Sequence, residues 1–121
     1  MSHEMAVLDF DALLEMLGGK REVVVSLLGT FLGELASDVD ASRKAMAEQD
    51  TESLRQIAHR IKGTSANLHA MMLSSVALEL EAACDEADFA LVALKHEIMV
   101  GQSQRLSEAI ETWRAHAGNG Q

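Results

Sequence analysis

The sequence predicts an all-α protein, an antiparallel four-helix bundle with a short extra helix at its N-terminus. Proline is absent and aromatic residues make up only 3% of the 121 residues, whereas hydrophobic residues make up 48%. Residues that favour strands are scarce outside positions 23–25. Four long segments repeat apolar residues at the helical period and are joined by short connections, as in antiparallel bundles.

Two helices are predicted in the first part of the chain. The first runs from an N-cap at Asp9 to Leu17, where Gly18 and Gly19 end it, and it would cover one end of the bundle. The second spans about residues 20–48. Its buried side is predicted from apolar and small residues three or four positions apart: Leu27, Leu28, Phe31, Leu35, Val39, Ser42 and Met46.

Two shorter helices are predicted next. The third begins at Asp50 or Thr51, either of which can cap it. The fourth is predicted to run from about Ser74 or Ser75 to Ala87.

The fifth helix is predicted over about residues 89–115, followed by a frayed tail at residues 118–120. Its apolar residues include Leu91, Leu94, Ile98, Ile110 and Trp113. Gly101, within this helix, is interpreted as a point of close helix packing. Four methionines are expected to fill the core: Met46, Met71, Met72 and Met99.

Charge and length restrict the function. A single domain over residues 1–121 is expected, with an ordered core at about residues 8–115. The formal net charge of −9 argues against a nucleic-acid partner and against a basic helix on a membrane surface. The longest apolar run, residues 89–94, is far shorter than the ~20 residues of a membrane span, and residues 1–8 lack a signal peptide's apolar segment. We therefore expect a cytoplasmic monomer, and Met1 and the compact length favour a free-standing protein.

Residues 54–68 are the most informative segment, because they form a helix with two opposite faces. The inward stripe consists of residues at helical spacing: Leu54, Ile57, Ala58, Ile61, Ser65 and Leu68. At about 100° per residue, His59 lies roughly 160° from the centre of this stripe and is expected to face water. Lys62 and Gly63, three and four residues later, are its neighbours on the helix surface.

Gly63 is the locally unfavourable residue of this helix. An exposed glycine inside a helix costs roughly 1 kcal/mol relative to alanine. It could be a tolerated accident or a kink near Thr64 and Ser65. Beside His59 and Lys62, however, a missing side chain would let another protein approach the imidazole closely, and local rules are often broken at functional sites.

Charge is unevenly distributed around this segment. Residues 53–70 contain Arg55, Arg60 and Lys62 and no acidic residue. Such a basic patch would suit an acidic or phosphorylated partner, although it could also be an ordinary solvated face. A cluster of acids follows at Glu79, Glu81, Asp85, Glu86 and Asp88.

The run His59-x-x-Lys62-Gly63, followed by the small residues of positions 64–67, resembles the signature of histidine phosphotransfer (HPt) domains. The resemblance extends over most of the chain through Leu8, Asp9, Phe31, Leu78, Glu79, Leu80 and Glu81. The chain departs from the family at His69, where members usually have glycine, and this departure concerns the turn after the motif helix.

The resemblance implies that His59 accepts a phosphoryl group from an aspartyl phosphate of one receiver domain and passes it to another. A neutral imidazole can act as the in-line nucleophile, and Lys62 can neutralise part of the phosphoryl charge. The receiver would bring Mg²⁺ and most of the catalytic groups, so no cofactor is expected on this chain. The expected partners are receiver domains of response regulators or hybrid histidine kinases.

Partner docking is assigned to Gly63, Arg55, Arg60 and Ala66. The sequence lacks the phosphate-binding patterns G-x-x-x-x-G-K-[ST] and G-x-G-x-x-G, so we predict a phosphocarrier and not an enzyme that uses ATP. Two alternatives stay open. One is a helical interaction module that docks receiver or kinase domains without accepting phosphate, and the other is a phosphatase-like or sequestering regulator that binds through the same face.

The remaining histidines fit other roles. His69 lies about 15 Å from His59 along a continuous helix, so it cannot share one phosphoryl group with it and is expected in a turn or exposed. His3 and His116 are expected in frayed ends.

Neither a metal site nor a disulfide is predicted. His96 and Glu97 begin like the zinc motif H-E-x-x-H, but Val100 stands where the second histidine belongs. Cys84, the single cysteine, falls at helical spacing with apolar residues and is predicted to be a buried thiol.

Overall fold

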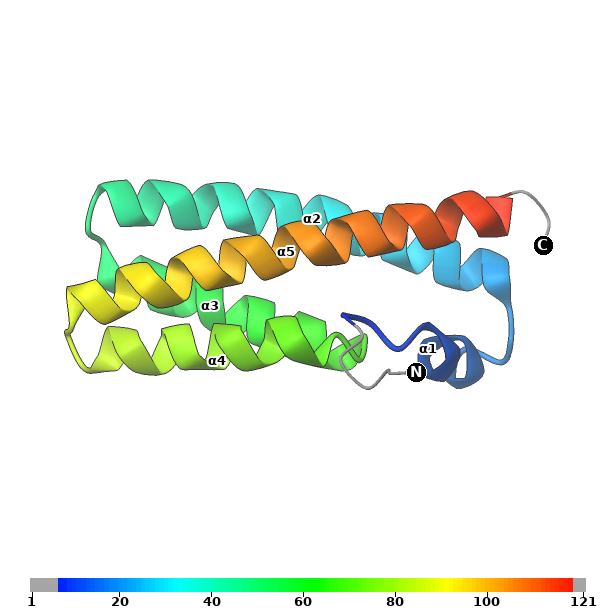
Figure 1. Cartoon of the computed structure of the whole chain (residues 1–121), viewed down its shortest axis with the longest axis horizontal. Coiled ribbons are helices and arrows are strands. Elements are labelled where there is room, and N and C mark those ends of the chain that lie inside the picture. Colours follow the sequence, from blue (N-terminus) through cyan, green and yellow to red (C-terminus); the bar gives the residue numbers. More distant parts are fainter. Residues whose placement is uncertain (1–6, 119–121) are drawn as a thin grey trace.

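The computed structural model describes residues 7–118, which form five helices and no strand. In chain order the helices are α1 (Phe10–Met16), α2 (Arg21–Ala47), α3 (Thr51–Asn67), α4 (Met71–Asp85) and α5 (Phe89–Gly118). The long helices α2 and α5 run the length of the molecule, while α3 and α4 lie along one half of it and α1 lies at the other (Figure 1). The predicted antiparallel four-helix bundle with a short extra N-terminal helix is confirmed.

Carboxylates begin three of the helices. Each accepts a hydrogen bond from the backbone N–H three residues later, at 2.9, 3.1 and 3.2 Å: Asp9, Asp50 and Asp88. These caps satisfy N–H groups that have no partner within the helix. Of the two predicted starts of α3, the cap is therefore Asp50.

A residue in the left-handed conformation follows each of the first four helices. The residues are Gly18, Gln49, His69 and Ala87, with φ of 73°, 54°, 64° and 58°. After α3, the N–H groups of His69 and Ala70 donate to carbonyls of Ala66 and Ser65 at 3.0 and 2.9 Å, which closes the helix. His69 thus has the predicted turn role, and its conformation explains why glycine suits this position.

The fourth helix begins earlier than predicted. α4 starts at Met71, not at Ser74 or Ser75, and it ends at Asp85 instead of Ala87. The turn at His69 reverses the chain in only three residues, so the helix resumes at once. Ser74 is not a cap, because its buried hydroxyl donates to the carbonyl of Lys62 at 3.1 Å.

The core lies between α2, α3, α4 and α5 and extends to α1 through Leu13. Its largest fully buried side chains are Leu13, Leu28, Leu54, Ile61, Leu73, Leu80, Met99, Leu106 and Ile110. The predicted inner face of α2 is confirmed at Leu28, Phe31, Leu35, Val39 and Ser42, while Leu27 and Met46 are half-buried.

Some apolar residues do not enter this core. Met71, Leu94 and Ile98 are 55%, 51% and 41% exposed, so the core role predicted for Met71 is wrong. Close packing at Gly101 is also wrong, because a Cβ there would meet no atom within 4 Å.

Helix α1 is held against the distal part of α5. The ring of Phe10 stacks on that of Trp113, with centroids 5.2 Å apart, and the Arg21 guanidinium lies 5.3 Å from the Trp113 ring centroid. Since α3 and α4 do not extend to this end, α1 covers the apolar surface there, as predicted (Figure 1).

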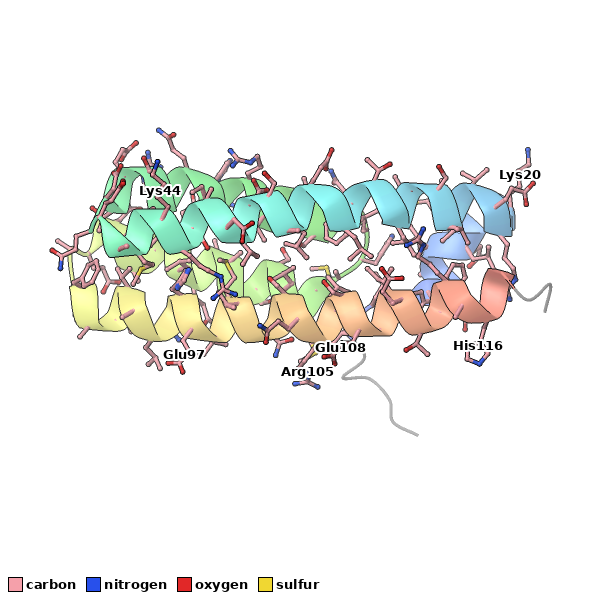
Figure 2. All side chains as sticks on the ribbon, turned by 90° about the horizontal axis from the view of Figure 1, so that it is seen from above. Lys20, Lys44, Glu97, Arg105, Glu108 and His116 are labelled. Carbon is pink, nitrogen blue, oxygen red and sulfur yellow. The ribbon has the colours of Figure 1, made fainter. Side chains whose placement is uncertain are left out.

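Helix α5 continues through the end predicted to fray. Its side chains Glu97, Arg105, Glu108 and His116 project away from α2 (Figure 2). His116 belongs to the helix, and its Nδ1 lies 2.9 Å from the carbonyl of Thr112, so its predicted place in a frayed end is wrong. Gly118 is likewise helical, whereas His3 and residues 119–120 lie outside the described residues. Within residues 7–118, no helix combines the length and apolar character needed to cross a bilayer.

Candidate functional site

His59 lies on the outward face of α3. Its side chain is 65% exposed, as the helical spacing predicted. The opposite face is fixed by burial of Leu54, Ile57, Ala58, Ile61, Ser65 and Leu68. Because these six residues determine the rotation of α3, they also hold His59 toward solvent.

Glu81 of α4 contacts both His59 and Lys62. The Nδ1 atom of His59 lies 2.9 Å from Oε2 of Glu81, and Nζ of Lys62 lies 3.1 Å from Oε1. The Glu81 side chain is only 17% exposed. An ionised carboxylate can only accept hydrogen bonds, so Nδ1 must carry the proton and the lone pair of neutral His59 resides on Nε2.

Glu81 is ionised at neutral pH. Desolvation on its own would raise its pKa, but hydrogen bonds from Lys62 and His59, together with their charges, hold the pKa of Glu81 below its ordinary value. The carboxylate is therefore available as an acceptor for both neighbours.

The register of α3 against α4 brings Glu81 next to His59 and Lys62. Ser74 and Glu81 are seven residues apart, so they lie on the same face of α4. Ser74 donates to the backbone carbonyl of Lys62, and Glu81 accepts from the side chain of the same lysine. Two contacts with one residue thus place the carboxylate beside His59.

Gly63 is exposed and borders on empty space. A Cβ at this position would meet no atom within 4 Å, so internal packing does not require glycine. The helix is continuous through Asn67, and the hydroxyl of Thr64 bonds to the carbonyl of Arg60 at 3.1 Å. The surface beside His59 is therefore open at Gly63 and at the exposed Ala66, which lies three residues further along the same helix.

The basic patch predicted for residues 53–70 is wrong, because acidic residues outside this stretch pair with its cations. Arg60 donates twice to Asp38 of α2, at 2.8 and 3.1 Å. Arg55 donates to Glu52 at 2.7 Å and lies 3.9 Å from Asp85 of α4. Both arginines keep a position near His59, but the surface they form is mixed in charge.

Sequence reasoning missed the role of Glu81. In the sequence Glu81 was noted only as part of the acidic cluster after the motif and of the family resemblance. Its partner His59 lies 22 positions earlier, so no local pattern connects the two residues. Leu78, one turn before Glu81, was also not assigned to the site. It is 51% exposed and adds an apolar side chain to this part of α4.

A second histidine has a different environment. His96 of α5 is 8% exposed, and its Nε2 lies 2.9 Å from the hydroxyl of Ser42 on α2. Burial, and to a lesser degree the charge of Arg43, lowers the pKa of His96. Cys84 is a buried free thiol, as predicted, and burial raises its pKa. In the described part of the chain, His, Cys, Asp and Glu side chains form no group of three suited to a metal ion.

Comparison with known proteins gives one family and two related structures. The Hpt domain family matches residues 26–116. The fold is similar to that of histidine-containing phosphotransfer protein B (HptB) from Pseudomonas aeruginosa PAO1, with a TM-score of 0.84 and 22% identity over 93% of this chain and 98% of that one. It is also similar to the HPT domain of the Hpt sensor hybrid histidine kinase from Shewanella, with a TM-score of 0.77 and 15% identity over 91% and 95% of the two chains. No curated protein matches the sequence.

Proposed function

Since this chain belongs to the Hpt domain family, we propose that it carries a phosphoryl group on His59 between aspartates of receiver domains in a two-component phosphorelay. One observation carries the assignment: His59 is exposed, and its Nδ1 is engaged by Glu81 while Nε2 retains the lone pair. This arrangement suits a nucleophile that a partner must reach from solvent.

In the proposed transfer, Nε2 of His59 attacks the phosphorus of a receiver's aspartyl phosphate in line with the bond to the leaving oxygen. The N–P bond forms as the P–O bond to the aspartate breaks. Lys62 turns from Glu81 toward the phosphoryl oxygens and neutralises part of their charge. The receiver supplies Mg²⁺ and the remaining catalytic groups, so this chain acts as a phosphocarrier without a cofactor of its own.

The proposed docking surface surrounds His59 on α3 and α4. Gly63 and Ala66 leave room for the receiver's loops, and Leu78 offers apolar contact area. Arg55 and Arg60 lie at its borders, where their paired charges contribute to orientation more than to affinity. The chain is proposed to act as a cytoplasmic monomer. Its proposed partners are the receiver domains of response regulators or hybrid histidine kinases.

The test is transfer from receivers of the same genome, each labelled with radioactive phosphate on its aspartate. The parent chain should take up label that is stable to alkali and labile to acid, as a phosphoramidate is, and His59→Gln should take up none. His69→Gln serves as a control with another partly exposed histidine replaced. A parent chain that binds receivers but remains unlabelled would instead support the interaction module.

A further inference from the structure

We infer that a groove between α2 and α3, next to the docking surface of His59, binds one lysine or arginine side chain of the receiver, and that Glu34 pairs with its charge. The inference rests on the proposed function, since it takes the receiver as the partner of His59. It assigns to Glu34 of α2 a part in selecting which receivers dock.

Two adjoining hollows make up this groove. One, of about 590 Å³, is polar and reaches the pair formed by Asp38 and Arg60. The other, of about 210 Å³, has apolar side chains in its wall: Leu27, Phe31 and Leu68. Three residues line both hollows and so connect them: Thr30, Glu34 and Thr64.

Glu34 is the acidic residue of the groove that lacks a partner. Asp38, one turn later on α2, accepts two hydrogen bonds from Arg60 at 3.1 and 2.8 Å, so these two charges compensate each other. Glu34 is exposed and pairs with no cation of the described part of the chain. Like charges four residues apart on a helix repel each other, so Glu34 beside Asp38 does not stabilise α2. A cation from a partner would offset this repulsion.

An apolar wall with one carboxylate at its border suits a long basic side chain. Lysine and arginine lay their aliphatic stems along apolar surface and keep the charged end in a polar environment. Here the stem would lie in the smaller hollow against Leu27, which is half-buried, and the charged end would reach Glu34. An acidic side chain would be repelled by Glu34, and an apolar one would leave the carboxylate unpaired beneath the partner.

The groove is open to a partner and close to His59. Gly33 is exposed, and a Cβ there would meet no atom within 4 Å, so packing within the chain does not require this helical glycine. Thr64 directly follows Gly63 and lies about 7.5 Å from His59 along the axis of α3. A receiver that contacts Gly63 would therefore also cover the groove.

The first test measures the effect of the charge on affinity. Binding of unphosphorylated receivers from the same genome to the full-length chain is followed by calorimetry at about 50 and 300 mM NaCl. For the receiver that binds the parent most tightly, Glu34→Gln should weaken binding about fivefold at the lower salt concentration and less at the higher one. Glu34→Lys should weaken it by at least about tenfold. Affinities equal to the parental value, or a parent that binds none of the receivers, would overturn the inference.

Asp40→Lys is the matched control for Glu34→Lys. Asp40 is an exposed acidic residue of the same helix, but it lines a different hollow, between α2 and α5. The change of net charge is the same, and affinity should stay within about twofold of the parental value at the higher salt concentration. Equal losses in the two lysine variants would overturn the inference, because they would indicate a general effect of charge.

Thr30→Trp tests the hollow with the charge left in place. Thr30 is exposed and lines both hollows, so a larger side chain there would occupy the groove without entering the core. Binding of the receiver should weaken by at least about tenfold, because an anchor side chain would lose its pocket. Thr30→Ala leaves the groove open and should bind as the parent does. Parental affinity in Thr30→Trp would overturn the inference.

A charge exchange identifies the occupant. Exposed lysines and arginines of the same receiver are changed to glutamate one at a time, and each variant is measured with the parent and with Glu34→Lys. One of these changes should weaken binding to the parent and restore binding to Glu34→Lys to within about twofold of the original pair. Restoration by none of them would overturn the inference.

Labelling by phosphoramidate separates this inference from the proposed function. The small donor needs no docking, so His59 should be labelled at the parental rate in Glu34→Lys and in Thr30→Trp. A parent chain that binds receivers but takes up no phosphate would contradict the proposed function, while the affinities would still decide the role of Glu34.

Discussion

Two histidines of this molecule each have a ring nitrogen 2.9 Å from a side-chain oxygen, yet their surroundings give them opposite roles. The side chain of His59 is 65% exposed, and its Nδ1 contacts the carboxylate of Glu81. His96 is 8% exposed, and its Nε2 contacts the hydroxyl of Ser42. Both contacts join two helices, α3 with α4 in the first case and α2 with α5 in the second.

The partner decides which nitrogen carries the proton. Ser42 donates its own hydroxyl hydrogen to the carbonyl of Val39 at 2.7 Å, so its oxygen accepts from Nε2–H of His96. The imidazole of His96 is thereby used as a buried link between helices. In His59 the carboxylate of Glu81 accepts a hydrogen bond from Nδ1–H, and the free lone pair lies on Nε2 of an exposed ring. The residue type alone therefore predicts neither role.

The largest effect is expected from His59→Gln. Labelling by phosphorylated receivers should be abolished, because the nucleophilic nitrogen is gone. The free energy of unfolding should change by no more than about 0.5 kcal/mol, as is usual for exposed positions. Urea unfolding and radioactive labelling measure the two quantities, and label persisting on this variant would direct attention to His69.

His96→Ala should give the reverse result. Removing a buried imidazole leaves a cavity and a lost hydrogen bond, so the free energy of unfolding should fall by about 2–4 kcal/mol. Label on His59 should be unchanged at temperatures where the variant is folded. If folded His96→Ala lost labelling on His59, the purely structural role of His96 would be contradicted.

Substitutions at two glycines test whether the open space beside His59 is needed for phosphoryl transfer from a receiver. Gly63 and Gly101 both lie within helices, and a Cβ on either would meet no atom within 4 Å. Gly63→Arg should lower transfer from a receiver by at least about tenfold, which corresponds to about 1.4 kcal/mol of docking energy. Labelling by phosphoramidate, which needs no docking, should stay near the parental rate.

Gly101→Arg is the matched control, because α5 carries the same substitution away from the site. Its transfer rate should equal that of the parent. Equal transfer in both variants would show that Gly63 is a tolerated helix position and not a point of contact with receivers.

The helical period in the sequence was sufficient to predict the bundle and the outward position of His59, and residue type predicted caps at Asp9 and at Asp50 or Thr51, of which Asp50 is observed. These features depend on neighbouring residues within one helix. Glu81 could not be assigned in the same way, because its contact with His59 depends on the register between α3 and α4. The pairing of Arg60 with Asp38 was missed for the same reason, and so the surface near His59 was predicted to be more basic than it is.

Errors in the fold arose where one residue type has two uses. Ser74 was predicted to begin the fourth helix, but its hydroxyl bonds to α3 from inside α4. Met71 was predicted to fill the core, but its apolar side chain is 55% exposed at the start of α4. The left-handed conformation of His69 could be recognised only from the departure from glycine at that position.

The turn after α3 provides a smaller stability effect. Because His69 has φ of 64°, His69→Gly should raise the free energy of unfolding by about 1 kcal/mol, as the left-handed conformation is costly for residues with a Cβ. Ala66→Gly, within the preceding helix, should lower it by a similar amount, about 1 kcal/mol. Transfer to His59 should be unaffected by His69→Gly. Urea unfolding measures the free energy of unfolding of both variants, and a decrease in His69→Gly would contradict the prediction.

The smallest effect should be a pH dependence of stability that originates at His96. Burial lowers its pKa in the folded protein below the ordinary value of 6.5, whereas in the unfolded chain the group titrates near that value. As the pH falls below about 6.5, the unfolded chain therefore binds a proton that the folded protein still excludes, and stability decreases. Carboxylates such as Glu81, whose ordinary value is 4.5, add their own loss only at lower pH. Urea midpoints at pH 7.5 and 5.5 should thus differ more in the parent than in His96→Gln, whose side chain does not titrate. Equal differences would mean that burial at His96 has no influence on stability in this range, and the contrast with His59 would then rest on exposure alone.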